Sequence, residues 1–218
     1  MKKVGVILSG CGVFDGAEIH EAVITLLAID RAGAEAVCFA PNVSQLHVVD
    51  HLKGQPAEGE SRNVLVEAAR IARGNIADVA SASAEDLDAL ILPGGFGAAK
   101  NLCTFAVDGP DCEIQPDVAH LIAAMHDLGK PLGFCCIAPA VAAKTLGDFG
   151  VELTIGNDAG TAQGLEALGA KHIECPVDSI HIDEARKVIS TPAYMYNERI
   201  SNVAAGIEKL VAAVLERA

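Results

Sequence analysis

Short apolar runs alternate with longer amphipathic stretches along the whole chain. Val4–Leu8 is fully apolar and ends in SGCG, a pattern typical of a buried parallel strand followed by a loop. The runs that predict strands are Val4–Leu8, Glu35–Ala40, Ala89–Leu92, Pro131–Cys135, Val151–Ile155 and Lys187–Ser190. The stretches that predict helices are Ala17–Ala32, Asn63–Arg73, Pro116–Gly129, Ala138–Leu146, Thr161–Leu168 and Ser201–Arg217.

This alternation predicts the fold class. Strands separated by helical stretches are typical of βαβ units, which form a mostly parallel sheet with helices on both faces. No linker, repeat or break in composition divides the chain, and Pro41–Ser61 reads as a polar, irregular segment within it. We therefore expect residues 1–218 to form a single α/β domain of three layers. Ligands in such sheets bind beyond the carboxyl ends of the strands, where the loops SGCG, PGGFG and CCIAP would meet.

The first predicted helix illustrates the amphipathic pattern. Ile19, Val23, Leu26 and Leu27 share one apolar face of Ala17–Ala32. Gly33 follows the last residue of this pattern and predicts the end of the helix.

Composition and charge exclude several classes of function. The formal charge is −13 without any basic stripe, which argues against binding to nucleic acid or to anionic membranes. Seven cysteines without regular spacing do not predict a disulfide framework, and no His/Cys cluster has the spacing of a metal site. The apolar run at Val4–Leu8 is too short for a signal peptide. We expect a cytoplasmic protein without a metal site.

The segment PLGFCCIAPAV at residues 131–141 raises the question of whether one of two adjacent cysteines is reactive. With Pro139 in the first turn of the next helix, Cys136 falls on the sharp turn between strand and helix. The positive end of that helix would favour the thiolate of Cys136, whereas Cys135 would point into the core. The alternative interpretation makes both cysteines small buried apolar residues.

Backbone N–H groups near this turn are candidates for stabilising an oxyanion. Gly94 and Gly95 end a predicted strand and expose bare backbone, and Ile137 follows Cys136 directly. The alternative is that the two glycines only allow a tight turn.

The motifs SGCGVFDGAEIHEAV, LPGGFGAAKNL, GFCCIAPA and TPAYM occur in an order that resembles the ElbB-type glyoxalases. These proteins are a branch of the DJ/PfpI superfamily, which is related to class I glutamine amidotransferases. The resemblance covers nearly the whole chain. It implies a flavodoxin-like sandwich, a homodimer, and a nucleophilic cysteine that works without a cofactor.

The same resemblance assigns site residues. The superfamily's elbow pattern, C-x-[AG]-P, places the nucleophile on Cys136, and its G-A-E-x-x-E pattern places the partner carboxyl on Glu21. A buried carboxyl beside a thiol would have a raised pKa, would hold a proton and could act as general acid and base. The alternative for Glu21 is a solvated helix face.

The sequence departs from the superfamily pattern because no histidine follows the nucleophile. His172, within an H-x-E stretch that ends at Glu174, is a weak substitute, with a solvated strand end as the alternative. Cys11 also lies near a strand end and would either contact the substrate, resolve an oxidised Cys136 or simply pack. A missing histidine argues against peptidase and glutaminase activity, since their nitrogen leaving groups need a proton donor.

Three functions remain open at this stage. The first is a glyoxalase, a lyase that converts glyoxal or another small 2-oxoaldehyde to a hydroxy acid through a cysteine hemithioacetal, with early glycation adducts as further substrates. The second is a redox sensor with incidental aldehyde turnover, because an accessible low-pKa thiol suits both roles. The third is an amidotransferase-type hydrolase, connected with isoprenoid biosynthesis by the family's older naming.

Overall fold

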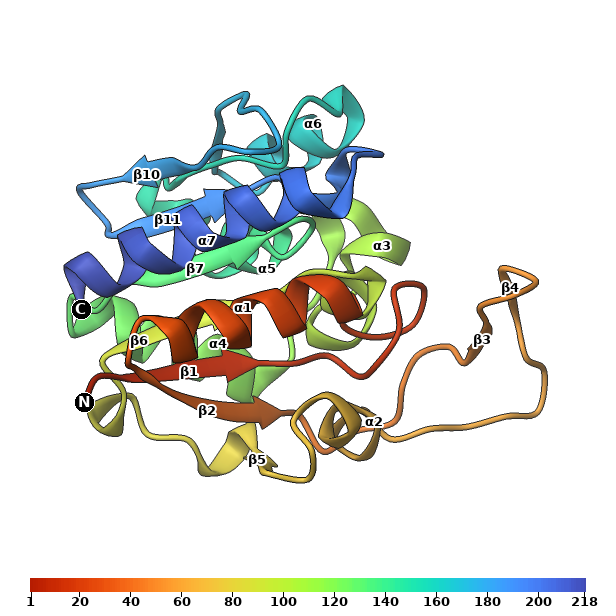
Figure 1. Cartoon of the computed structure of the whole chain (residues 1–218). Helices are drawn as coiled ribbons and strands as arrows, with labels where there is room; N and C mark the ends of the chain where they lie inside the picture. The colour runs from red at the N-terminus through yellow and green to blue at the C-terminus, as the bar shows by residue number, and fades with distance from the viewer.

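The computed structural model describes residues 1–218 and confirms the α/β prediction (Figure 1). Seven strands form one sheet in the order β10-β11-β7-β6-β1-β2-β5, and every neighbouring pair is parallel except β10–β11. These strands are β1 (Lys3–Ile7), β2 (Glu35–Ala40), β5 (Ile76–Asp78), β6 (Ala89–Leu92), β7 (Leu132–Cys135), β10 (His181–Asp183) and β11 (Val188–Thr191).

Helices cover both faces of the sheet, as expected for a flavodoxin-like sandwich. In Figure 1, α1 and α7 lie side by side in front of the sheet, and α4 and α5 lie behind it. The α-helices are α1 (Ile19–Arg31), α2 (Val64–Ile71), α3 (Phe105–Asp108), α4 (Pro116–Asp127), α5 (Pro139–Leu146), α6 (Ala159–Ala167) and α7 (Ile200–Arg217). None of the helices is both long and apolar enough to span a membrane.

The central strands build a separate core on each face. In β7, Leu132 and Phe134 pack into the cluster beneath α4 and α5, whereas Cys135 packs into the cluster beneath α1 and α7. All of these side chains are fully buried. Because successive residues point to opposite faces, an unbroken apolar strand serves both cores, which explains why these runs are visible in the sequence.

The predicted apolar face of α1 is not the buried one. Its buried residues are Glu21, Ala22, Thr25, Ala28 and Ile29. Of the predicted face, Ile19, Val23 and Leu27 are instead 43%, 47% and 41% exposed. Its fourth member, Leu26, is partly buried and packs against the core. The buried face of α1 combines small side chains with Glu21 and Ile29, and an apolar stripe is left in solvent.

Other differences lie at the edges and outside the central sheet. The predicted strand Val151–Ile155 shortens to β8 (Glu152–Leu153), which pairs with β9 (Lys171–His172) in a separate two-stranded sheet. Residues 41–61, expected to be irregular, contain the small hairpin of β3 (Val49–Asp50) and β4 (Gln55–Pro56). Figure 1 shows that this hairpin projects well away from the sheet.

Candidate active site

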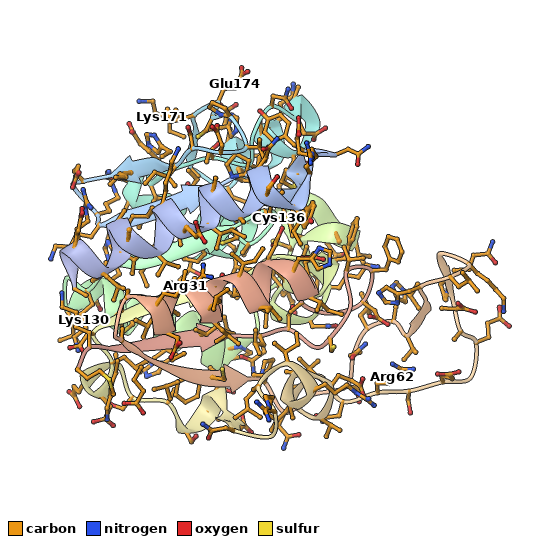
Figure 2. All side chains as sticks on the ribbon, viewed as in Figure 1. Arg31, Arg62, Lys130, Cys136, Lys171 and Glu174 are labelled. Atoms are coloured by element: carbon orange, nitrogen blue, oxygen red, sulfur yellow. The ribbon has the colours of Figure 1, made fainter.

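Cys136 occupies a strained turn directly after β7. Its φ is +58°, a left-handed conformation that non-glycine residues rarely adopt. The turn is closed by the Ala138 N–H, which donates to the Cys135 carbonyl at 2.9 Å, and Pro139 is the first residue of α5. This is the geometry of a nucleophile elbow. Figure 2 shows Cys136 at the end of the sheet towards which the parallel strands point.

The loop after β6 lies against this turn, and only glycine fits at its second and third positions, Gly94 and Gly95. A Cβ on Gly94 would lie 2.5 Å from the Cβ of Cys136 and 2.8 Å from Oε2 of Glu21. Gly95 has a φ of +90°, and a Cβ there would lie 2.3 Å from the backbone nitrogen of Glu18. The PGGFG motif is therefore needed to bring backbone within reach of the thiol and of α1.

Glu21 is fully buried in the first turn of α1 and faces the thiol of Cys136. The N–H of Gly94 donates to Oε2 at 2.9 Å, and the N–H of Tyr194 donates to Oε1 at 3.1 Å. Burial outweighs these hydrogen bonds and raises the pKa of Glu21 to about 7. The carboxyl is thus balanced between its two protonation states near neutral pH, which suits a general acid and base.

The Cys136 thiol differs from expectation. Burial, followed by the neighbouring Glu21 carboxylate, raises its pKa well above the usual value. The N–H groups of Gly95 and Ile137 at the sulfur oppose this rise but do not cancel it. The resting site therefore holds a neutral thiol rather than the expected thiolate, and Glu21 is the group that can accept its proton.

The N–H groups predicted to hold an oxyanion divide into two kinds. Those of Gly95 and Ile137 donate to the sulfur of Cys136 and act to lower the pKa of its thiol, and their role towards an oxyanion stays a prediction. The N–H of Gly94 already donates to Glu21. The prediction for Gly94 is wrong in this respect, because its donor positions the acid instead.

A cavity of about 290 Å³ opens onto Cys136. Six of its nine lining residues are hydrophobic. The lining consists of Val13, Glu18, Gly95, Phe96, Cys136, Ile137, Thr161, Tyr194 and Met195. Such a mostly apolar pocket with a few polar groups is typical of a small-molecule site.

Two polar groups of this pocket were missed by the sequence analysis. Glu18 caps α1 by accepting the N–H of Glu21 at 2.7 Å and also lines the cavity. The Tyr194 hydroxyl lies 2.9 Å from Nδ1 of His20, a residue exposed to solvent. His20 is thus connected to the pocket by its contact with the hydroxyl of Tyr194. The helical spacing of Glu18 and Glu21 could have revealed the first, but no local pattern links His20 to Tyr194.

The two weaker candidates, His172 and Cys11, lie outside the cavity at Cys136. Nε2 of His172 accepts the N–H of Ile155 at 3.4 Å, and Glu174 projects from the surface (Figure 2). Cys11 is half-buried, and its charged neighbours include Glu67 and Arg70 of α2. Neither residue lines the cavity at Cys136. No group of three or more His, Cys, Asp or Glu side chains is arranged to hold a metal ion, and all seven cysteines are free.

Comparison with known proteins finds similarity over nearly the whole chain. The human glutamine amidotransferase-like class 1 domain-containing protein 3, mitochondrial, is 53% identical over 98% of this chain and 82% of its own length. The zebrafish (Danio rerio) ES1 protein, mitochondrial, is 36% identical over 88% of this chain and 77% of its own length. No family model matches the chain.

Solved structures agree with the fold. The crystal structure of an isoprenoid biosynthesis protein with an amidotransferase-like domain from Ehrlichia chaffeensis superposes with a TM-score of 0.93 at 38% identity, covering 100% of this chain and 99% of that one. A DJ-1 superfamily protein from Agrobacterium tumefaciens superposes with a TM-score of 0.57 at 16% identity, over 99% of this chain and 89% of that one. The second likeness concerns the fold alone.

Proposed function

Because the chain belongs to the ES1-type glutamine amidotransferase-like proteins of the DJ-1/ThiJ/PfpI superfamily, we propose that it is a cofactor-independent glyoxalase. The substrate is glyoxal or a related small 2-oxoaldehyde, and the product is the corresponding 2-hydroxy acid. The observation that carries this proposal is the pairing of Cys136 on its strained turn with the buried carboxyl of Glu21.

In the first step, the sulfur of Cys136 adds to the aldehyde carbon. The neutral thiol passes its proton to Glu21 during the attack, because a carboxylate with a pKa of about 7 can accept it. The developing alkoxide is stabilised by the N–H groups of Gly95 and Ile137, which meet at the sulfur. Glu21 then returns the proton to this oxygen, and the result is a neutral hemithioacetal with a free carboxylate beside it.

The second step moves hydrogen from the first substrate carbon to the second. Glu21 removes the proton from the sulfur-bearing carbon and returns it to the neighbouring carbon. Meanwhile the second carbonyl oxygen gains a proton and the first oxygen loses one, and the Tyr194 hydroxyl with its partner His20 exchanges these protons with solvent. The hemithioacetal becomes a thioester of the hydroxy acid without any external oxidant or reductant. Water then hydrolyses the thioester and restores the thiol.

The relatives' names raise the possibility of amidotransferase-type hydrolysis. Release of ammonia needs a proton donor aimed at the leaving nitrogen, and amidotransferase triads use a histidine in this role, whereas the acid at the sulfur here is Glu21. No histidine lines the cavity, and His20 reaches it only through Tyr194. We therefore favour aldehyde chemistry, in which no nitrogen leaving group is expelled.

We also propose that the chain forms a homodimer and works in a reducing compartment. The exposed stripe of Ile19, Val23 and Leu27 on α1 is an apolar surface that a second copy of the chain would bury. The seven free cysteines suit the cytoplasm or another reducing space. The relatives carry the word mitochondrial in their names. Light scattering of Val23→Glu beside the unchanged protein tests the dimer: a monomeric variant supports it, and a monomer in both cases contradicts it.

The function is tested by incubating the purified chain separately with glyoxal, methylglyoxal and glutamine. Glycolate and lactate are measured by NMR, and ammonia is measured by a coupled assay. Cys136→Ala serves as the control. Hydroxy acid formed only by the unchanged protein supports the glyoxalase. Ammonia from glutamine, or hydroxy acid formed equally by Cys136→Ala, overturns it.

A further inference from the structure

A second hollow continues from the cavity at Cys136. It has a volume of about 340 Å³ and shares Phe96, Ile137 and Thr161 with the first. Ile137 is the residue directly after the nucleophile. A group attached to a carbon on the sulfur of Cys136 can therefore pass over Ile137 into this second hollow without leaving the protein surface.

The second hollow carries no charged side chain, although 21% of the chain's residues are charged. Its walls are apolar side chains and bare backbone. The lining consists of Phe96, Ala99, Phe105, Ala106, Gly109, Pro110, Ile137, Gly160, Thr161 and Gly164. In a protein with a formal charge of −13, an uncharged concave surface beside the nucleophile favours an apolar ligand and disfavours an ionic one.

Glyoxal, with two carbons and two oxygens, is much smaller than the space provided. A water molecule occupies about 30 Å³ in the liquid, and the first cavity alone measures about 290 Å³. A molecule of four heavy atoms leaves most of this room to water and gains nothing from the side chains of Phe96 and Ile137. The walls of both hollows would be used only by a larger substrate.

We propose that the second hollow is a subsite for the apolar substituent of the substrate, and that the enzyme prefers 2-oxoaldehydes R–CO–CHO in which R is an alkyl chain. This inference rests on the proposed function and names its substrate class. The aldehyde carbon binds the sulfur of Cys136, and R lies over Phe96 and Ile137 towards Phe105. The reaction adds one water and keeps R in place, so the product is R–CH(OH)–COOH.

The test is the dependence of kcat/KM on chain length. Glyoxal, methylglyoxal, propylglyoxal and hexylglyoxal are compared with the unchanged protein. Each methylene buried in the subsite should raise kcat/KM about fourfold, which corresponds to about 0.8 kcal/mol. The rise should stop when R is longer than the hollow.

A matched pair of variants connects this gain to the subsite. Gly160 has room for a side chain, because a Cβ there meets only Oδ1 of Asp158, at 3.6 Å. Gly160→Leu should fill the hollow and remove the rise of kcat/KM with chain length. The ratio of kcat/KM for hexylglyoxal to that for glyoxal should then be at least about tenfold lower than in the unchanged protein. Gln163→Leu, exposed on the same helix and outside the hollow, should keep the rising series.

A second measurement does not depend on turnover. Alkylation of Cys136 by iodoacetamide and by N-hexyl iodoacetamide is followed by peptide mass spectrometry. The subsite predicts faster alkylation by the hexyl reagent, and predicts that Gly160→Leu removes this advantage. Suppose that glyoxal is turned over, but kcat/KM does not rise with the chain length of R and both reagents alkylate Cys136 at equal rates. This result would overturn the subsite without contradicting the proposed glyoxalase. If no aldehyde is consumed, the proposed function fails and the substrate class fails with it.

Discussion

Oε1 of Glu21 accepts a hydrogen bond of 3.1 Å from the backbone N–H of Tyr194, 173 residues away along the chain. The other carboxyl oxygen accepts from Gly94 at 2.9 Å. The loops after β11 and β6 therefore both hold the acid that begins on α1. Ala193, directly before Tyr194, has a φ of +44°, so this loop is strained in the same way as the turn at Cys136. The position of Glu21 follows from three separate elements of the fold.

Replacing Glu21 by Gln should separate thiol reactivity from turnover. The Glu21 carboxylate is the second largest cause, after burial, of the raised pKa of Cys136. Without this charge the thiolate fraction rises, so alkylation by iodoacetamide at pH 7.5 should be faster. Turnover of glyoxal should fall by about 10² to 10⁴-fold, because the general acid and base is lost. Equal losses of alkylation rate and turnover would contradict this division of roles.

Glu21 should also make stability depend on pH. Burial raises its pKa to about 7 in the folded chain, against about 4.3 for an unfolded glutamate. The unfolded chain loses the proton first, so this stabilisation is full below about pH 4.3 and is lost as the pH rises through about 7. Glu21→Gln lacks this dependence.

The corresponding measurement is urea unfolding of both proteins from pH 4 to pH 8. The free energy of unfolding of Glu21→Gln minus that of the unchanged protein should rise by on the order of 3 kcal/mol over this range. In addition, the variant should lose about 1 to 3 kcal/mol of unfolding free energy at every pH, because the glutamine amide leaves one backbone N–H without an acceptor. A difference that does not change with pH would show that the folded carboxyl titrates normally.

The two adjacent cysteines should differ sharply in function. Cys136→Ala should lower glyoxal turnover by at least about 10³-fold, because the covalent intermediate cannot form. Cys135 is fully buried in the core beneath α1 and α7. Cys135→Ala should keep kcat within about threefold and should cost about 1 to 2 kcal/mol in unfolding free energy. Activity assays and thermal unfolding of both variants check this, and comparable losses from both substitutions would reject the assignment of the nucleophile.

Tyr194 and His20 should affect kcat more than KM. Tyr194→Phe keeps the ring in the pocket and removes the hydroxyl, so kcat should fall about 10²-fold with KM little changed. His20→Gln keeps a hydrogen-bond partner for the tyrosine but cannot exchange its proton in the same way, so a smaller fall is expected. A larger effect on KM than on kcat would indicate that the pair only shapes the pocket. The ratio of kcat in H₂O to that in D₂O provides a second readout.

The central sheet could be predicted because its strands are unbroken apolar runs buried on both faces. The edge strands β5 (IAD) and β10 (HID) could not, since each has three residues and includes a charged one. The orientation of α1 was also beyond sequence reasoning. Its apolar stripe indicates a helix, but only the packing of α1 against α7 decides which face is buried.

The candidate site was predicted in part for similar reasons. The distance from Cys136 to Pro139 is a local pattern and located the elbow, whereas the pairing of Tyr194 with His20 spans 174 residues. The protonation state of the thiol was misjudged. A helix N-terminus contributes about 0.3 to 2 kcal/mol. Full burial shifts the pKa of an ionisable group by up to about 3 to 5 units, so the larger effect prevails and the thiol stays neutral.

The carboxyl group of Glu18 in the cavity wall also bears on how the product of the proposed reaction would leave. A 2-oxoaldehyde enters uncharged, so no charge repels it from a cavity that Glu18 lines and that has Glu21 buried at the sulfur of Cys136. The hydroxy acid ionises once it is formed, and its charge then has the same sign as that of a glutamate carboxylate. Under the proposed function, the product should therefore leave the cavity readily, and other small anions should compete poorly for it. A detoxifying enzyme with this arrangement would keep working while its product accumulates.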